Sequence, residues 1–158
     1  MLSDNRMNCS PEMLPARSDA GRAVGRFHHV GFVVTSIAPV IESFCRALGG
    51  KSWSETWHDS VQKVRVAFIL PQTEGDPGFE LVEPAGPGSP VEDFLEVGGG
   101  LHHVCYEVDD LDRAVRDARS LGLIMVRRPQ PAVAFDGRRI AWFISREKLL
   151  IELLEESC

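Results

Sequence analysis

The sequence has few cysteines, no excess of positive charge and no long apolar stretch, and each shortage excludes a class of protein. Its 158 residues include four cysteines and no Cys-x-x-Cys pair, so a disulfide framework or a zinc knuckle is not indicated, and we expect reduced thiols in the cytoplasm. No apolar run approaches the ~20 residues of a membrane helix. Asp and Glu (23) outnumber Lys and Arg (17), which disfavours a nucleic acid or an anionic membrane as partner.

The chain does have the balance of a soluble globular protein, with 44% hydrophobic and 25% charged residues. Residues 1–25 are polar, contain Pro and Gly and show no hydrophobic period, so we predict a disordered tail there. The remaining residues, 26–158, are numerous enough for one domain with its own core.

That domain contains the same pattern twice. An apolar segment that starts at the doublet His28-His29 predicts a strand, and an amphipathic helix and three further strands follow. The second half repeats this order from the doublet His102-His103. Each half therefore predicts a βαβββ unit, module 1 over about 26–86 and module 2 over about 100–156.

A short helix is predicted between the modules. Ser89-Pro90-Val91-Glu92 has the form of a capping box with Pro at the first helical position, which predicts a linking helix over about 89–97. The predicted fold class is α+β, with the two βαβββ modules forming an open, curled mixed β-sheet cup around a metal site.

The prediction of a metal site comes from polar residues that recur at nearly the same offset in both modules: a histidine doublet, and a glutamate (Glu80 and Glu152) inside an apolar strand. A buried carboxylate is costly unless it is protonated, paired or bound to a cation. If the modules pack their sheets face to face, one histidine and one glutamate of each meet at a common centre that suits a divalent transition-metal ion. Since side chains alternate across a strand, we expect only one histidine of each doublet to face inward.

These residues resemble the vicinal oxygen chelate superfamily and, within it, the methylmalonyl-CoA epimerase branch. The matching segments are His28-His29-Val30-Gly31, Glu80-Leu81-Val82-Glu83-Pro84, Ser89-Pro90-Val91, Gly100-Leu101-His102-His103, Glu107-Val108-Asp109-Asp110 and Leu150-Ile151-Glu152-Leu153. The resemblance implies one divalent ion per site (cobalt, manganese, nickel or zinc). It carries the metal ligands onto His29, Glu80, His103 and Glu152.

The resemblance also implies an activity: an isomerase that inverts the α-carbon of an acyl thioester through a metal-stabilised enolate. The implied partner is a small-molecule acyl thioester or a related oxygen-chelating substrate, and the implied assembly is a homodimer. Glu152 is the candidate base, because a carboxylate beside the metal can accept a proton. The second acid/base is unassigned, since Gln62–Val66 contains no carboxylate; His58 and Asp59 are expected to be exposed loop residues.

Three other members of the superfamily remain as alternatives. A glyoxalase I (lactoylglutathione lyase)-like enzyme can use the same two histidines and two glutamates. An extradiol dioxygenase needs only two histidines and one carboxylate, so the fourth ligand disfavours it. A non-catalytic small-molecule-binding member, as in antibiotic resistance, typically lacks the metal set. The Ser89-Pro90 box and the Glu107–Asp110 segment favour the epimerase branch.

Overall fold

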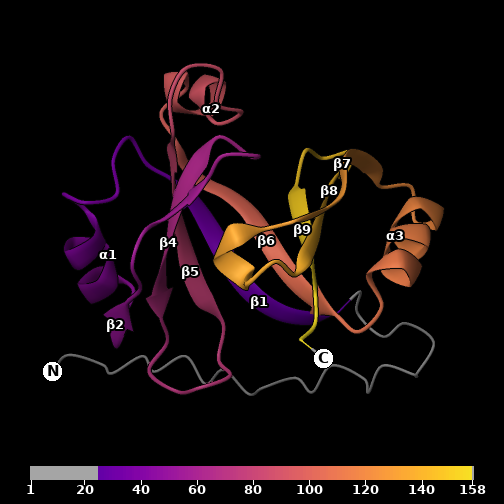
Figure 1. The fold of residues 1–158 in the computed structure, drawn as a ribbon, viewed down its shortest axis with the longest axis horizontal. Coiled ribbons are helices and arrows are strands. Elements are labelled where there is room, and N and C mark those ends of the chain that lie inside the picture. The colour runs from indigo at the N-terminus through magenta and orange to yellow at the C-terminus, as the bar shows by residue number, and fades with distance from the viewer. Residues whose placement is uncertain (1–24, 158) are drawn as a thin grey trace, which may run out of the picture.

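The structure is a computed structural model that describes residues 25–157, so the predicted tail falls almost entirely outside the described residues. In the described range, no helix is both long and apolar enough to span a membrane. Two helices, a short linking helix and one nine-stranded sheet make up the fold of this range (Figure 1).

The secondary structure follows the predicted repeat, except that four strands instead of three follow the helix in module 1. Module 1 contains β1 (Arg26–Val33), α1 (Ile41–Ala47), β2 (Ser52–Trp53), β3 (Trp57–Asp59), β4 (Val64–Leu70) and β5 (Gly78–Pro84). Module 2 contains β6 (Gly100–Val108), α3 (Leu111–Ser120), β7 (Ile124–Pro131), the 3-10 turn η1 (Val133–Phe135), β8 (Arg139–Ile144) and β9 (Leu150–Glu155). The linking helix α2 is Glu92–Glu96.

The two modules join edge to edge and not face to face, and the predicted fold class, two modules in one open mixed sheet, is confirmed. The strand order is β2-β4-β5-β1-β6-β9-β8-β7, with β3 paired to β4. Within each module the first strand lies parallel to the last one, β1 to β5 and β6 to β9, while β1 and β6 pair antiparallel at the seam. Figure 1 shows β1 and β6 crossing the middle of the molecule, with α1 and α3 at opposite ends. The result is a single open mixed sheet with a pseudo-two-fold relation between its halves.

Alternation along the strands separates the helix-covered core from the site. Buried residues of α1, Ile41 and Cys45, pack with Ala67, Ile69 and Leu81. In module 2, α3 contributes to a cluster of buried residues, Leu111, Ala114, Val115, Ala118, Ala141, Phe143 and Leu153. Because side chains alternate across a strand, Glu80 beside Leu81 and Glu152 beside Leu153 point to the face away from the helices.

The linking helix is shorter than the predicted 89–97 and lacks the expected cap. It begins after Val91, with no capping side chain, and the Ser89 hydroxyl is buried without a hydrogen-bond partner. The Glu92 carboxylate does reach back, but it accepts from the Gly88 N–H at 2.8 Å. Of the two hydrogen bonds of a capping box, only the one to the glutamate therefore forms, and its donor is the N–H of Gly88 instead of that of Ser89.

Candidate metal centre and cavities

The candidate site lies on the four central strands, where the seam brings the two modules together. His29 on β1 faces Cys105 on β6, and His103 faces Gly31 in the same register. On the outer sides, Glu80 of β5 pairs with Gly31, and Glu152 of β9 pairs with Cys105. Each module thus supplies one histidine and one glutamate to equivalent places on the two sides of the seam.

The four side chains converge through their terminal atoms. The Nε2 atoms of His29 and His103 are 3.2 Å apart. The Glu80 Oε2 lies 3.7 Å from the first and 3.3 Å from the second. The Glu152 Oε2 lies 3.5 and 3.9 Å from the same two nitrogens. All four residues are buried, so two imidazoles and two carboxylates share one small, water-poor volume.

Gly31 makes room for one of these ligand rings. A Cβ at this position would lie 1.9 Å from Cε1 and 2.5 Å from Nε2 of His103, far inside normal contact distance. The His103 ring therefore occupies the space that any larger residue at position 31 would fill. The equivalent position on β6 is Cys105, so the pseudo-two-fold symmetry is broken here.

Aromatic rings hold both imidazoles from the sides. Phe68 packs edge-on against His29, with ring centroids 5.4 Å apart, and Trp142 packs in the same way against His103 at 4.7 Å. Phe68 pairs with Glu80 across the sheet and Trp142 pairs with Glu152. Each half-site therefore has the same three-part construction of histidine, glutamate and aromatic ring.

The electrostatics of the cluster favour a cation. Burial raises the pKa of Glu80, but attraction to the nearby nitrogens of His103 and His29 outweighs this effect and lowers it to about 2. Burial raises the pKa of Glu152 to about 7, and its Oε2 is buried without a hydrogen-bond partner. Imidazole nitrogens and carboxylate oxygens are ligands that divalent transition metals bind, and a buried carboxylate is costly without a cation. The residues present therefore fit such an ion.

The first histidine of each doublet also faces the site, which the alternation argument missed. The Nδ1 atoms of His28 and His29 are 2.8 Å apart, and those of His102 and His103 are 3.0 Å apart. Burial lowers the pKa of both His28 and His102 to about 4. The expectation that one member of each doublet points outward is wrong.

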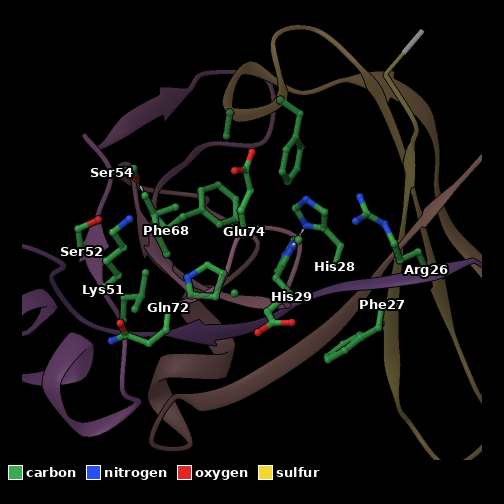
Figure 2. Close-up of a pocket in the computed structure, with 18 of the residues that line it drawn as sticks. Arg26, Phe27, His28, His29, Lys51, Ser52, Ser54, Phe68, Gln72 and Glu74 are labelled. Atoms are coloured by element: carbon green, nitrogen blue, oxygen red, sulfur yellow. Dashed lines mark hydrogen bonds between the residues drawn. The ribbon is translucent and has the colours of Figure 1, made fainter.

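Two cavities open beside this cluster. The smaller, of about 290 Å³, is lined by three of the candidate ligands, Glu80, His103 and Glu152. The larger, of about 570 Å³, is lined by His28 and His29. Figure 2 shows the larger cavity, with Lys51 and Gln72 on one side of the histidine pair and Arg26 on the other. Phe135 lines both cavities and contacts His29 in a stacked arrangement at 6.0 Å.

Asp59 differs from its prediction. It is 3% exposed and lines the smaller cavity, whereas the sequence predicted an exposed loop residue. Its carboxylate accepts hydrogen bonds from the Gln62 N–H at 2.7 Å and from Gln62 Nε2 at 3.2 Å. A polar segment gives no period that distinguishes a short edge strand from a loop, so the sequence held no signal for this residue; His58 is exposed as expected.

Known proteins share this sequence pattern. A family model described as Glyoxalase/Bleomycin resistance protein/Dioxygenase superfamily matches residues 28–142. An ethylmalonyl-CoA/methylmalonyl-CoA epimerase of Cereibacter sphaeroides is 32% identical over 123 residues, which are 74% of this chain and 86% of the relative.

Solved structures share the fold. Methylmalonyl-CoA epimerase from Mycobacterium tuberculosis superimposes with a TM-score of 0.72 at 26% identity, covering 84% of this chain and 89% of that one. A variant of the Streptomyces coelicolor methylmalonyl-CoA epimerase, in complex with 2-nitronate-propionyl-CoA, gives a TM-score of 0.73 at 24% identity, covering 86% and 100%. The chain belongs to the glyoxalase/bleomycin resistance/dioxygenase superfamily, and methylmalonyl-CoA epimerases are among its relatives.

Proposed function

We propose that this protein is a divalent-metal-dependent isomerase that inverts the α-carbon of an acyl-CoA thioester. One observation carries the proposal: two histidines and two glutamates converge on a buried centre, where the Glu152 Oε2 has no partner, and three of them line a cavity. The epimerase relatives support the reaction type, and the acyl-CoA analogue bound to the Streptomyces coelicolor enzyme supports the substrate class.

His29, Glu80, His103 and Glu152 would hold the ion. When bound, a divalent ion supplies charge that polarises a thioester carbonyl oxygen and a neighbouring substrate oxygen. The α-hydrogen of a thioester is weakly acidic, so this charge is what makes its removal feasible. The metal identity is part of the proposal, with cobalt, manganese, nickel and zinc as the candidates.

In this scheme Glu152 removes the α-proton. Glu152 lines the smaller cavity. Its carboxylate has two oxygens, so one can accept a proton while Oε2 faces the imidazole nitrogens. Trp142 and Phe135 contribute apolar walls to the same cavity and keep water away from the reacting carbon. A second acid, which the sequence leaves unassigned, gives a proton to the opposite face of the planar carbon and so inverts the centre, while Glu152 releases its proton to solvent.

The test is exchange of the substrate α-proton with solvent. Metal-loaded protein is incubated in deuterium oxide with methylmalonyl-CoA, and then with other α-substituted acyl-CoA thioesters, while NMR and mass spectrometry follow the label. We expect deuterium at the α-carbon as the stereocentre inverts. A protein that labels none of these thioesters but isomerises a glutathione hemithioacetal would be a glyoxalase instead.

The cytoplasmic location and the homodimer stay predictions. Equilibrium sedimentation of the purified protein tests the second: a mass of twice the 17.5 kDa chain is expected, and a monomer at micromolar concentration would contradict it.

A further inference from the structure

Both histidine doublets sit at bulges of the seam. Along β1 the register passes from Phe27 opposite Tyr106 to His29 opposite Cys105, so His28 is the extra residue. Along β6 it passes from His103 opposite Gly31 to Leu101 opposite Phe32, so His102 is the extra residue. A bulge re-aims the side chain of its extra residue, and this explains how neighbouring residues of one strand bring their rings together.

The two bulges produce the same contact twice. In each doublet the rings meet edge to face, with centroids 5.1 Å apart for His28–His29 and 5.2 Å for His102–His103. The approaching atoms are the two Nδ1 nitrogens, at 2.8 and 3.0 Å. In the second histidine of each doublet, Nε2 points the other way, into the cluster with Glu80 and Glu152.

This geometry fixes where the protons are when a metal is bound. A histidine that ligates through Nε2 has its lone pair there and its proton on Nδ1. Two ring nitrogens at hydrogen-bond distance need one N–H and one lone pair. His29 and His103 are then the donors, and His28 and His102 are the acceptors, each neutral with its own proton on Nε2.

We propose that His28 and His102 are positioning residues: each accepts a hydrogen bond from Nδ1 of the following histidine and so holds that ring, in one tautomer, with Nε2 toward the metal centre. The inference rests on the metal site of the proposed function. Partners of this kind, outside the ligands themselves, orient the ring and raise its basicity as a ligand. The acceptor here is another imidazole, supplied by the adjacent residue of the same strand.

The surroundings keep these acceptors in place. The His28 ring packs edge-on against Phe135, with centroids 5.7 Å apart, and the His102 ring packs edge-on against Phe94 at 4.9 Å. Each lines one of the two cavities, His28 the larger and His102 the smaller. A direct role in binding substrate is therefore the competing explanation that an experiment must separate from positioning.

The experiment compares alanine and asparagine at each position in the full chain. His28→Ala and His102→Ala remove the acceptor, whereas Asn places an amide oxygen close to where the imidazole Nδ1 was. His58→Ala is the matched control, because His58 is exposed on β3. Zinc and cobalt dissociation constants are measured by chelator competition, and the Nδ1 protons of the zinc-loaded proteins are followed by NMR.

We expect each alanine variant to lose about 10- to 100-fold in metal affinity and to lose or shift the Nδ1 proton signal of the following histidine. The asparagine variants should stay within about 3-fold of wild type, like His58→Ala. Wild-type affinity and unchanged Nδ1 signals in both alanine variants would overturn the inference, as would asparagine variants as weak as the alanine ones. A change in KM at saturating metal, without a change in affinity, would identify a substrate contact instead.

These outcomes are distinct from those that test the proposed function. If metal affinity falls as expected but no thioester is labelled in deuterium oxide, the positioning role holds and the isomerase proposal fails. If thioesters are isomerised and the alanine variants bind metal normally, the isomerase proposal holds and the positioning role fails. A wild-type protein that takes up no divalent ion refutes both.

Discussion

Gly31 offers the sharpest test of how the seam builds the metal centre. In Gly31→Ala the new Cβ would lie 1.9 Å from Cε1 of His103, whereas carbon atoms in contact are about 3.5 to 4 Å apart. The ring must therefore move by roughly 1.6 Å or more, against a tolerance of about 0.2 Å for metal–ligand distances. We expect the affinity for a divalent ion to fall at least about 100-fold, or roughly 2.7 kcal/mol, close to the effect of His103→Ala.

The fold should survive this substitution. Overpacking costs about 1 to 3 kcal/mol, and the lower chain entropy of alanine offsets about 0.4 to 1 kcal/mol of it. Cys105→Ala is the matched control, since the position equivalent to Gly31 already carries a Cβ. Adding His103→Ala removes the ring atoms that the new methyl group would strike, so the destabilisation by Gly31→Ala should shrink by about 0.5 to 3 kcal/mol in that background.

Chelator competition measures the affinity, and thermal denaturation followed by circular dichroism measures the stability. Wild-type metal affinity in Gly31→Ala would refute the reasoning, because the ring could not then occupy the position described. An equal destabilisation by Gly31→Ala with and without His103 would also refute it, since no contact between the two positions would exist.

Four further predictions follow from other contacts. Glu152→Gln should keep most metal affinity but abolish α-proton exchange, because an amide oxygen can ligate but cannot take a proton; undiminished exchange by NMR would exclude Glu152 as base. Removal of the metal by a chelator should lower the melting temperature, since an ion at 1,000 times its dissociation constant adds about 4 kcal/mol. Asp110→Ala should cost about 1 kcal/mol in denaturant titrations, because this carboxylate caps α3 by accepting from Arg113 N at 2.8 Å. Burial opposes ionisation of Glu107, but its hydrogen bonds with Arg26 and Arg138 lower its pKa. The ionised carboxylate therefore stabilises the fold at pH values above its unfolded pKa, and this stabilisation is lost as the pH falls through its folded pKa. Glu107→Gln should lower the free energy of unfolding by roughly 2 kcal/mol at pH 7 and make it depend less on pH on the acid side.

The repeat in the sequence was enough to predict the elements but not how the halves join. Apolar periods predict a strand, a helix and three strands in each half. Module 2 has this order, whereas in module 1 four strands, β2 to β5, follow the helix. A period describes only which face of an element is buried. It does not show which edge of β1 is free to pair with another strand. One continuous sheet, joined by the antiparallel pairing of β1 with β6, could therefore not be distinguished from two separate sheets packed face to face. The superfamily is confirmed by its family model.

For the site, recurrence identified the two histidine doublets with Glu80 and Glu152, and the family resemblance selected His29 and His103 within the doublets. The structure brings these four residues together; their role as metal ligands stays a prediction. The sequence could not reveal what the bulges do. A bulge depends on the register between two strands far apart in the chain, and an alternation rule assumes that there is none. The doublets His28-His29 and His102-His103 contained the hint, since the same polar residue twice in a row violates alternation in both modules.

Because the seam divides the ligands equally, an ion bound there would act as a cross-link between the halves of the chain. Neither β1 and β5 nor β6 and β9 alone has more than one histidine and one glutamate of the set. Loosening of either module would therefore expel the ion, and its binding energy would oppose the opening of both. The metal-loaded protein should consequently unfold as one cooperative unit. In the metal-free protein, only the β1–β6 pairing and its packing couple the unfolding of the two modules.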